Sequence, residues 1–117
     1  MGHAFKIKEH DLLPRLEGAA VRRSDGEPLD MVGATAVFQM RASGPAGAIV
    51  ATGVATILSP TQLTASGINL AYVWAAGQTA TAGFYEGELE IRYPGGITQT
   101  VPGAETFIPI RVTDSVA

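Results

Sequence analysis

The sequence contains no cysteine, and charged residues make up only 16% of it. Without cysteine the chain has neither disulfides nor a thiolate metal site, which fits assembly in a reducing compartment. The fold must therefore rest on a hydrophobic core. A chain of 117 residues is long enough for one, because a domain of that size buries roughly two-thirds of its unfolded surface.

Long apolar runs and clusters of positive charge are also missing. The opening MGHAFKIKEHDLLP lacks the apolar stretch of a secretory signal, and no window approaches the length of a membrane span, roughly 18 apolar residues. The net charge is −3, and the one local basic pair is Arg22-Arg23. Nucleic-acid binding depends on clustered Lys and Arg, so we expect neither nucleic acid nor membrane as a partner.

The placement of the charges is uneven. Every Asp, Glu, Lys and Arg lies in 1–41 or 86–117, and the 44 residues from Ala42 to Tyr85 contain none. Half of the side chains of any strand in that stretch must point away from the core. Two interpretations are open: a Thr- and Ser-rich outer face of a β-protein, or a surface covered by a partner, since interface cores are depleted of charge.

Pro and Gly recur every eight to twelve residues, and the segments between them are rich in Val, Ile, Thr and aromatic residues, which predicts an all-β protein. We expect one domain over 1–117, an immunoglobulin-like antiparallel β-sandwich of seven or eight short strands. Pro109 predicts an edge strand, and Gly53 predicts a bulge or the close approach of another backbone. The expected strands are 4–8, 13–23, 33–42, 48–58, 67–74, 84–93, 97–102 and 106–112.

The segment EGELEIRY carries Glu86, Glu88 and Glu90 at alternate positions, and Arg92 continues the row. Such a row could hold a metal, supply an acid/base pair or form the solvated side of a strand. The intervening positions are mostly apolar, and neighbouring sequence adds no histidine or second acid cluster, so we favour the solvated side. The row is also the first charge after the neutral stretch, and we expect it to mark the border of a contact surface.

Other candidates for chemistry are sparse. His3 and His10 lack cysteine partners and a marked nucleophile, and no phosphate-binding glycine motif is present. Tyr72 and Trp74 could form a sugar-stacking platform, although a lone Trp in a β-sandwich is usually a core residue. We therefore predict no catalytic residue, no metal site and no cofactor. The predicted core anchors are Phe38, Tyr72, Trp74, Tyr85, Leu89 and Ile91.

Several blocks of the sequence, taken in order, resemble the N-terminal immunoglobulin-like domain of phage baseplate upper proteins. The resemblance covers most of the chain and rests on order and spacing, since no single block is diagnostic. The matching positions are Asp11 and Pro14, Asp25 to Val37, Tyr72 and Trp74, Thr79 to Glu88, Tyr93 to Gly96, and Thr100 to Pro102.

The resemblance implies a non-catalytic virion structural protein, assembled in the host cytoplasm and present in symmetric copies. Its partners would be other virion proteins or further copies of itself. Baseplate upper proteins continue into a long extension that this sequence lacks, so the implied role is an accessory subunit of the baseplate or tail. Decoration of the capsid is the alternative. A carbohydrate-binding or adhesion module and a hydrolase using the glutamate row are hypotheses of other classes.

Overall fold

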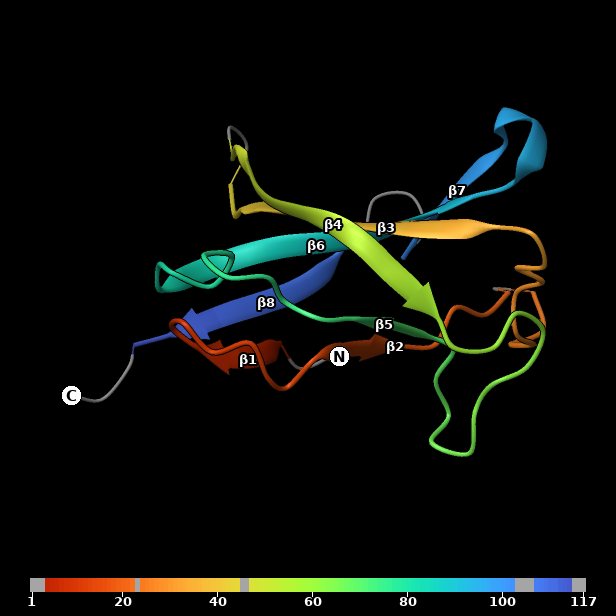
Figure 1. The fold of residues 1–117 in the computed structure, drawn as a ribbon, viewed down its shortest axis with the longest axis horizontal. Helices are drawn as coiled ribbons and strands as arrows, with labels where there is room; N and C mark the ends of the chain where they lie inside the picture. The colour runs from red at the N-terminus through yellow and green to blue at the C-terminus, as the bar shows by residue number, and fades with distance from the viewer. Residues whose placement is uncertain (1–3, 23, 45–46, 103–106, 115–117) are drawn as a thin grey trace.

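The computed structural model describes residues 4–22, 24–44, 47–102 and 107–114 (Figure 1). Strands dominate these residues, and the only helical element among them is a short 3-10 turn, η1 (Pro94–Gly96). The all-β prediction is confirmed. The strands are β1 (Phe5–Lys8), β2 (Leu16–Gly18), β3 (Thr35–Ala42), β4 (Ile49–Ile57), β5 (Leu70–Tyr72), β6 (Gly83–Arg92), β7 (Thr98–Val101) and β8 (Ile108–Thr113).

All eight strands belong to one hydrogen-bonded sheet in the order β1-β8-β6-β3-β4-β5-β2, with β7 added beside β6. The sheet curls into a nearly closed, barrel-like shape. The pair β1–β8 is parallel and the other pairs are antiparallel. The chain therefore forms a single domain, although its strand pairing does not divide it into two separate stacked sheets.

The longest strand, β6, pairs with three other strands. On one side it pairs with β3, from Tyr85 to Arg92. On the other side β8 pairs with residues 83–87 and β7 with residues 89–92. The sheet continues past β8 to β1, whereas within the described ranges no strand lies beyond β7, whose hairpin projects from the body in Figure 1. On the side away from β3, the first half of β6 is thus followed by two strands, β8 and β1, and the second half by β7 alone.

The prediction that Pro109 marks an edge strand is wrong. Strand β8 lies between β6 and β1, and Pro109 is opposite Glu86 of β6. The physical reason is the offset of β1, whose pairing with β8 begins only at Ile110. Proline lacks a ladder donor, so it is tolerated at this position because β1 does not reach it.

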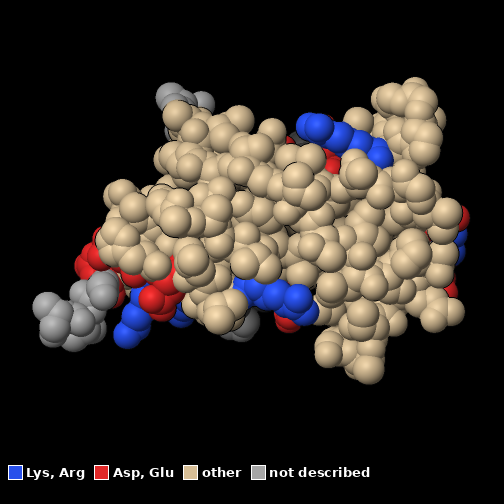
Figure 2. Space-filling view, viewed as in Figure 1, with Lys and Arg blue, Asp and Glu red and all other residues tan. Residues whose placement is uncertain are grey.

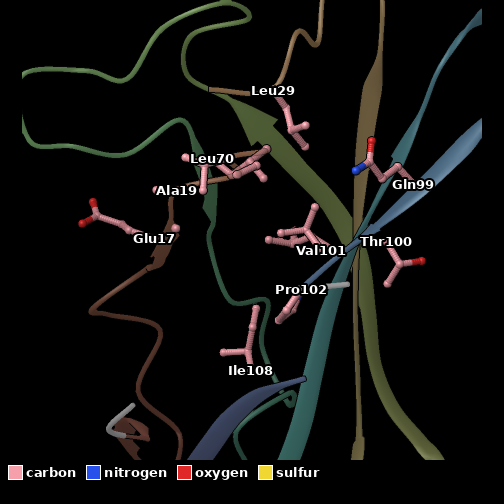
Figure 3. A pocket seen from close by; sticks show the side chains of 13 residues that line it. Glu17, Ala19, Leu29, Leu70, Gln99, Thr100, Val101, Pro102 and Ile108 are labelled. Carbon is pink, nitrogen blue, oxygen red and sulfur yellow. The ribbon is translucent and has the colours of Figure 1, made fainter. Parts of the chain in front are cut away.

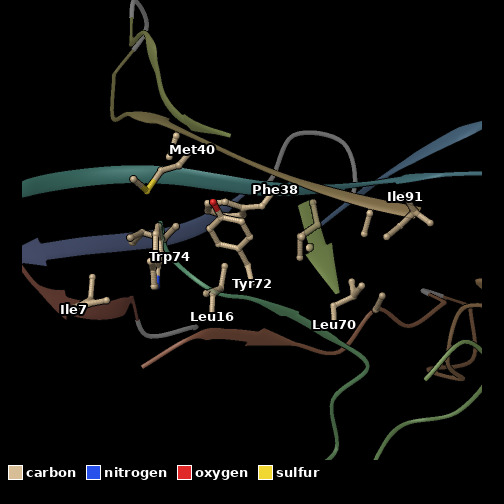
Figure 4. Close-up of a cluster of buried hydrophobic side chains, with 14 of the residues drawn as sticks. Ile7, Leu16, Phe38, Met40, Leu70, Tyr72, Trp74 and Ile91 are labelled. Carbon is tan, nitrogen blue, oxygen red and sulfur yellow. The ribbon is translucent and has the colours of Figure 1, made fainter. Parts of the chain in front are cut away.

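Alternation along the strands builds the core. In β3, Ala36, Phe38 and Met40 are buried while the residues between them are more exposed. The rings of Phe38 and Tyr72 stack at 4.4 Å, and Trp74 meets each of them edge-on at 5.5 Å between centroids (Figure 4). Edge-to-face and stacked aromatic pairs add about 0.5–1.5 kcal/mol beyond their buried area. This aromatic cluster is the centre of the core.

The prediction for Gly53 needs correction. The β3–β4 register is regular at Gly53, and the irregularity lies instead between Met40 and Arg41. The close approach is made by a side chain, since a Cβ added to Gly53 would lie 2.5 Å from the hydroxyl oxygen of Tyr72. Glycine is required here because the aromatic cluster occupies the space of any side chain.

Asn69 is a buried polar residue that ties three segments together. Its side chain accepts a hydrogen bond from the Ala20 N–H at 2.7 Å and donates one to the Ala20 carbonyl at 2.9 Å. Its backbone N–H donates to the carbonyl of Gly18, and its carbonyl accepts from the N–H of Leu58. A buried amide whose side-chain oxygen and nitrogen are both hydrogen-bonded fixes the relative positions of the segments that it joins.

Candidate contact surface

The outward side chains of β4 form an uncharged surface, which we call the neutral face. It consists of Val50, Thr52, Val54 and Thr56, and all four are exposed. They alternate with residues that point into the core, as a half-buried strand requires. In Figure 2 uncharged atoms extend without interruption across the front of the molecule, over β4, and the charged side chains lie along the margins.

The neutral face also exposes apolar side chains. Val54 is 81% exposed, more than any other exposed large hydrophobic residue of the described chain, and Val50 is 46% exposed. Ile49 at the start of the same strand is 60% exposed. Single exposed apolar residues are normal, but several along one strand in a surface without charge are typical of a contact surface.

The loop beside the neutral face is held in place by Gln78. Its side-chain oxygen accepts hydrogen bonds from the Tyr72 hydroxyl at 2.7 Å and from the Ala75 N–H at 2.9 Å. Its side-chain nitrogen donates to the Thr52 carbonyl at 3.3 Å. The amide of Gln78 therefore joins β4 to the segment that follows β5.

A second anchor holds the other end of that loop. Thr79 is buried, and its hydroxyl donates to the carbonyl of Asp11 at 2.8 Å, while its own carbonyl accepts from the N–H of His10 at 2.9 Å. The N–H of Ala82 donates to the carboxylate of Glu9 at 3.1 Å. Fixed loops lose little conformational entropy on binding, so the surface around β4 is preorganised for a contact.

The glutamate row lies on the outer face of β6, two strands away from β4. Glu86 pairs with Arg41 at 2.9 Å and its side chain is only 14% exposed, while Glu90 pairs with Arg92 at 2.6 Å. Glu88 is exposed and lies opposite Gln39. The carboxylates of Glu86 and Glu90 are thus paired with arginines within the chain.

Phe84 and Arg111 border this row on the side of β8. The guanidinium carbon of Arg111 lies 5.2 Å from the centre of the Phe84 ring, and Phe84 is 64% exposed. Cation–π pairs at exposed sites contribute about 0.5–1 kcal/mol. Phe84 is the last apolar side chain on the outer face of β6 before Glu86, so the change from neutral to charged surface takes place within β6 itself.

The structure places the predicted core anchors as follows. Phe38, Tyr72, Trp74, Leu89 and Ile91 are buried, and Tyr85 is half-buried against the core. Trp74 is 2% exposed, so it offers no ring face for sugar stacking.

The predicted histidines are not brought together with other candidate groups. His10 is exposed in a turn, and His3 lies outside the described residues. Within the described ranges, no group of three or more His, Cys, Asp or Glu residues is placed to hold a metal ion.

Two titratable groups have shifted pKa values, and neither lies on the neutral face. The backbone N–H of Glu27 and the guanidinium of Arg22 lower the pKa of Asp25, which is fully exposed in a turn. Burial and the nearby Asp30 raise the pKa of Tyr93, whose hydroxyl donates to the Asp30 carbonyl at 3.0 Å. Both shifts belong to turns that hold the fold together.

A pocket of about 560 Å³ opens at the end of the barrel beside β7 (Figure 3). One wall is formed by residues 17–21 and the other by residues 99–102. Leu29, Leu70, Leu89 and Ile108 complete the lining. We call this pocket the groove. Among the described residues that line it, Glu17 is the one that is charged, and its carboxylate pairs with Arg15 at 2.8 Å.

Sequence reasoning missed Gln78, Asn69 and the groove. Gln78 could have been noticed as the one long polar side chain in AAGQTATAG, a stretch of small residues. Asn69 could have been noticed as an amide next to the apolar run of a strand. No local signal predicts the groove, because its two walls are about 80 residues apart in the sequence.

Comparisons of the chain with protein-family models, with curated proteins and with solved structures found no match. Among the residues that the structure describes, no helix is long and apolar enough to cross a membrane.

Proposed function

We propose that this protein is a non-catalytic structural subunit of a phage virion that attaches to the baseplate or tail through its neutral face. The observation that carries the contact is the exposure of Val54 and Val50 on a preorganised surface, the neutral face, whose residues carry no charge. The assignment to a virion and to its baseplate rests on the sequence resemblance. The finer immunoglobulin-like assignment is part of the same proposal and rests on the same resemblance.

The arrangement of the charges supports a binding role over catalysis. The candidate carboxylates Glu86 and Glu90 pair with arginines on an open strand face. A catalytic acid needs a pocket that shifts its pKa, whereas the carboxylates of Glu86 and Glu90 are held in ion pairs on the outward side of a strand. The ion pairing of the row therefore does not favour the hydrolase hypothesis, and the buried Trp74 removes the stacking platform of a carbohydrate-binding module.

Decoration of the capsid is the second candidate within the same class. A small domain with an uncharged face could bind a head lattice as readily as a tail component, so the neutral face favours neither. The resemblance favours the baseplate or tail.

The direct test is to find the protein in particles. Virions from the host that carries this gene would be purified and dissociated, and the separated heads and tails would be analysed by mass spectrometry. We expect the protein in the tail fraction at a fixed ratio to the other tail proteins. Recovery with the heads would favour the capsid alternative, and recovery in neither fraction would refute the virion assignment.

A further inference from the structure

The groove is bounded by two strand edges that have no strand partner within the described chain. On one wall, β7 pairs with β6 alone. The N–H of Tyr93 donates to the carbonyl of Ile97 at 2.7 Å, so Ile97 directs its polar backbone groups toward β6. Because these directions alternate along an antiparallel strand, Thr98 and Thr100 direct their N–H and carbonyl groups away from β6.

The opposite wall also has backbone N–H and carbonyl groups that point away from its neighbouring strand. The carbonyl of Gly18 accepts from the N–H of Asn69, and the N–H of Ala20 donates to the Asn69 side chain, so these two residues face β5. By alternation, Glu17 and Ala19 direct their backbone groups to the other side. Strand β2 pairs with β5 alone, which leaves this edge open.

The space between the two edges has an apolar floor. Leu70, Leu89 and Ile108 lie beneath it, and Figure 3 shows Val101 and Pro102 directed into it. Gly18 leaves it unfilled, because a Cβ added there would have no atom within 4 Å. The volume of about 560 Å³ lies within the range of sites that bind ligands, roughly 300–1,000 Å³.

The first half of β6, residues 83–87, shows that the sheet can continue by one more strand at this position. There the sheet continues from β6 to β8 and then to β1, which pairs with β8 through residues 110–113. At the β7 half the sheet stops after β7, and the groove occupies the position of the next strand. An exposed strand edge is a template for pairing with another chain, and neither Lys nor Pro occurs within β7 itself, while Pro102, which follows it directly, ends the stretch that can donate.

We infer that the groove binds an extended, uncharged β-strand of another protein, which pairs with the free edge of β7 and places alternate apolar side chains on the floor. Main-chain hydrogen bonds to Thr98 and Thr100 would supply affinity, and the floor would supply specificity. The strand would be uncharged because Glu17, the one charged residue in the described part of the lining, is already paired with Arg15. This second contact is independent of the virion assignment.

The test uses the full chain and a fluorescently labelled peptide of eight residues in which threonine and valine alternate. We expect saturable binding, measured by fluorescence anisotropy. We also expect slower amide hydrogen exchange at Thr98 and Thr100 in the complex. A peptide of the same composition with a central proline cannot form the ladder and should bind at least about ten-fold more weakly. Equal binding of both peptides would overturn the proposal, because it would show an apolar pocket without strand pairing.

Two variants separate the groove from general stability. A Cβ at Gly18 would have no atom within 4 Å, so Gly18→Leu places a side chain in the groove and should weaken peptide binding at least ten-fold. Thr35→Leu adds a leucine on the exposed face of β3 and should leave binding unchanged. Thr100→Pro removes an N–H that points away from β6, so it should weaken binding while the thermal unfolding midpoint stays within a few degrees.

Two results would contradict the inference. Unchanged binding in both Gly18→Leu and Thr100→Pro would show that the peptide binds elsewhere. If the protein alone forms dimers that Gly18→Leu dissociates, the occupant is a second copy of this chain, and the assignment to a different protein is wrong.

Discussion

The outward side chains of β4 and β6 belong to the same sheet, but those of β6 include a row of charges whereas those of β4 are uncharged. On β6 the carboxylates of Glu86 and Glu90 find arginine partners within the chain, and the row reaches solvent as a charged surface. On β4 the outward residues are valine and threonine, and Val54 is 81% exposed. The comparison teaches that the carboxylates of Glu86 and Glu90 on β6 have partners within the chain, whereas the β4 row leaves apolar area exposed to solvent.

The largest expected effect comes from disturbing the glycines beneath the two rows. A Cβ at Gly53 would lie 2.5 Å from the hydroxyl oxygen and 2.8 Å from a ring carbon of Tyr72, whose hydroxyl is held by Gln78. We expect Gly53→Ala to lower the free energy of unfolding by about 2–3 kcal/mol, because overpacking a well-filled core costs typically 1–3 kcal/mol. Urea unfolding followed by Trp74 fluorescence measures it.

Gly87→Ala is the matched variant beneath the β6 row. Its Cβ would lie 2.7 Å from the terminal Cδ1 of Ile110, which can rotate away, and 3.0 Å from a ring carbon of Phe38. We therefore expect a smaller loss, about 1–2 kcal/mol. If Gly87→Ala proved more destabilising than Gly53→Ala, the locked position of Tyr72 under β4 would be wrong.

Neutralising the charged row should have a smaller effect. We expect replacement of Glu86, Glu88 and Glu90 by Gln to lower the free energy of unfolding by about 1 kcal/mol, since exposed ion pairs contribute roughly 0–1 kcal/mol. Most of that should come from Glu86, whose side chain is 14% exposed. Assembly should be nearly unchanged. Loss of assembly with retained stability would instead make the glutamate row part of the contact.

The smallest expected effect lies in the turn at Asp25, away from both rows. Its pKa is lowered first by the backbone N–H of Glu27 and then by Arg22, so Arg22→Ala should raise the pKa only part of the way to its ordinary value. A lowered carboxyl pKa stabilises the fold above the unfolded-state pKa, and this contribution disappears as the pH falls through the folded-state pKa. NMR titration of the Asp25 carboxyl carbon would check the pKa, and urea unfolding at several pH values would check the stability.

The local pattern predicts the central strands well. Alternation identifies the buried side of β3, and Pro94-Gly95-Gly96 identifies the hairpin between β6 and β7. These features depend on neighbouring residues, so a single sequence contains them. The burial of Trp74 likewise follows from the apolar residues around it.

The way the sheet closes could not be predicted in the same manner. Phe5 pairs with Ile110 across about 100 residues, and no local pattern encodes that choice or the offset that accommodates Pro109. The expected strands at 13–23 and 67–74 shrink to β2 and β5, because Pro14 and the Gln78 bridge take the neighbouring backbone out of the ladder. The sequence shows that this stretch has no charge, but only the structure shows that the neutral face is exposed.

The central claim is that the neutral face is a protein contact, and Val54→Asp tests it most directly. Val54 points into solvent, so the substitution should change the free energy of unfolding by no more than about 0.5 kcal/mol. Thr35→Asp adds the same charge on the outer face of β3, opposite Arg92, and serves as the control. The measurement is the amount of each variant recovered with purified tails, relative to the unmodified protein. We predict at least a ten-fold loss for Val54→Asp and full recovery for Thr35→Asp, and equal recovery of the two variants would contradict the account.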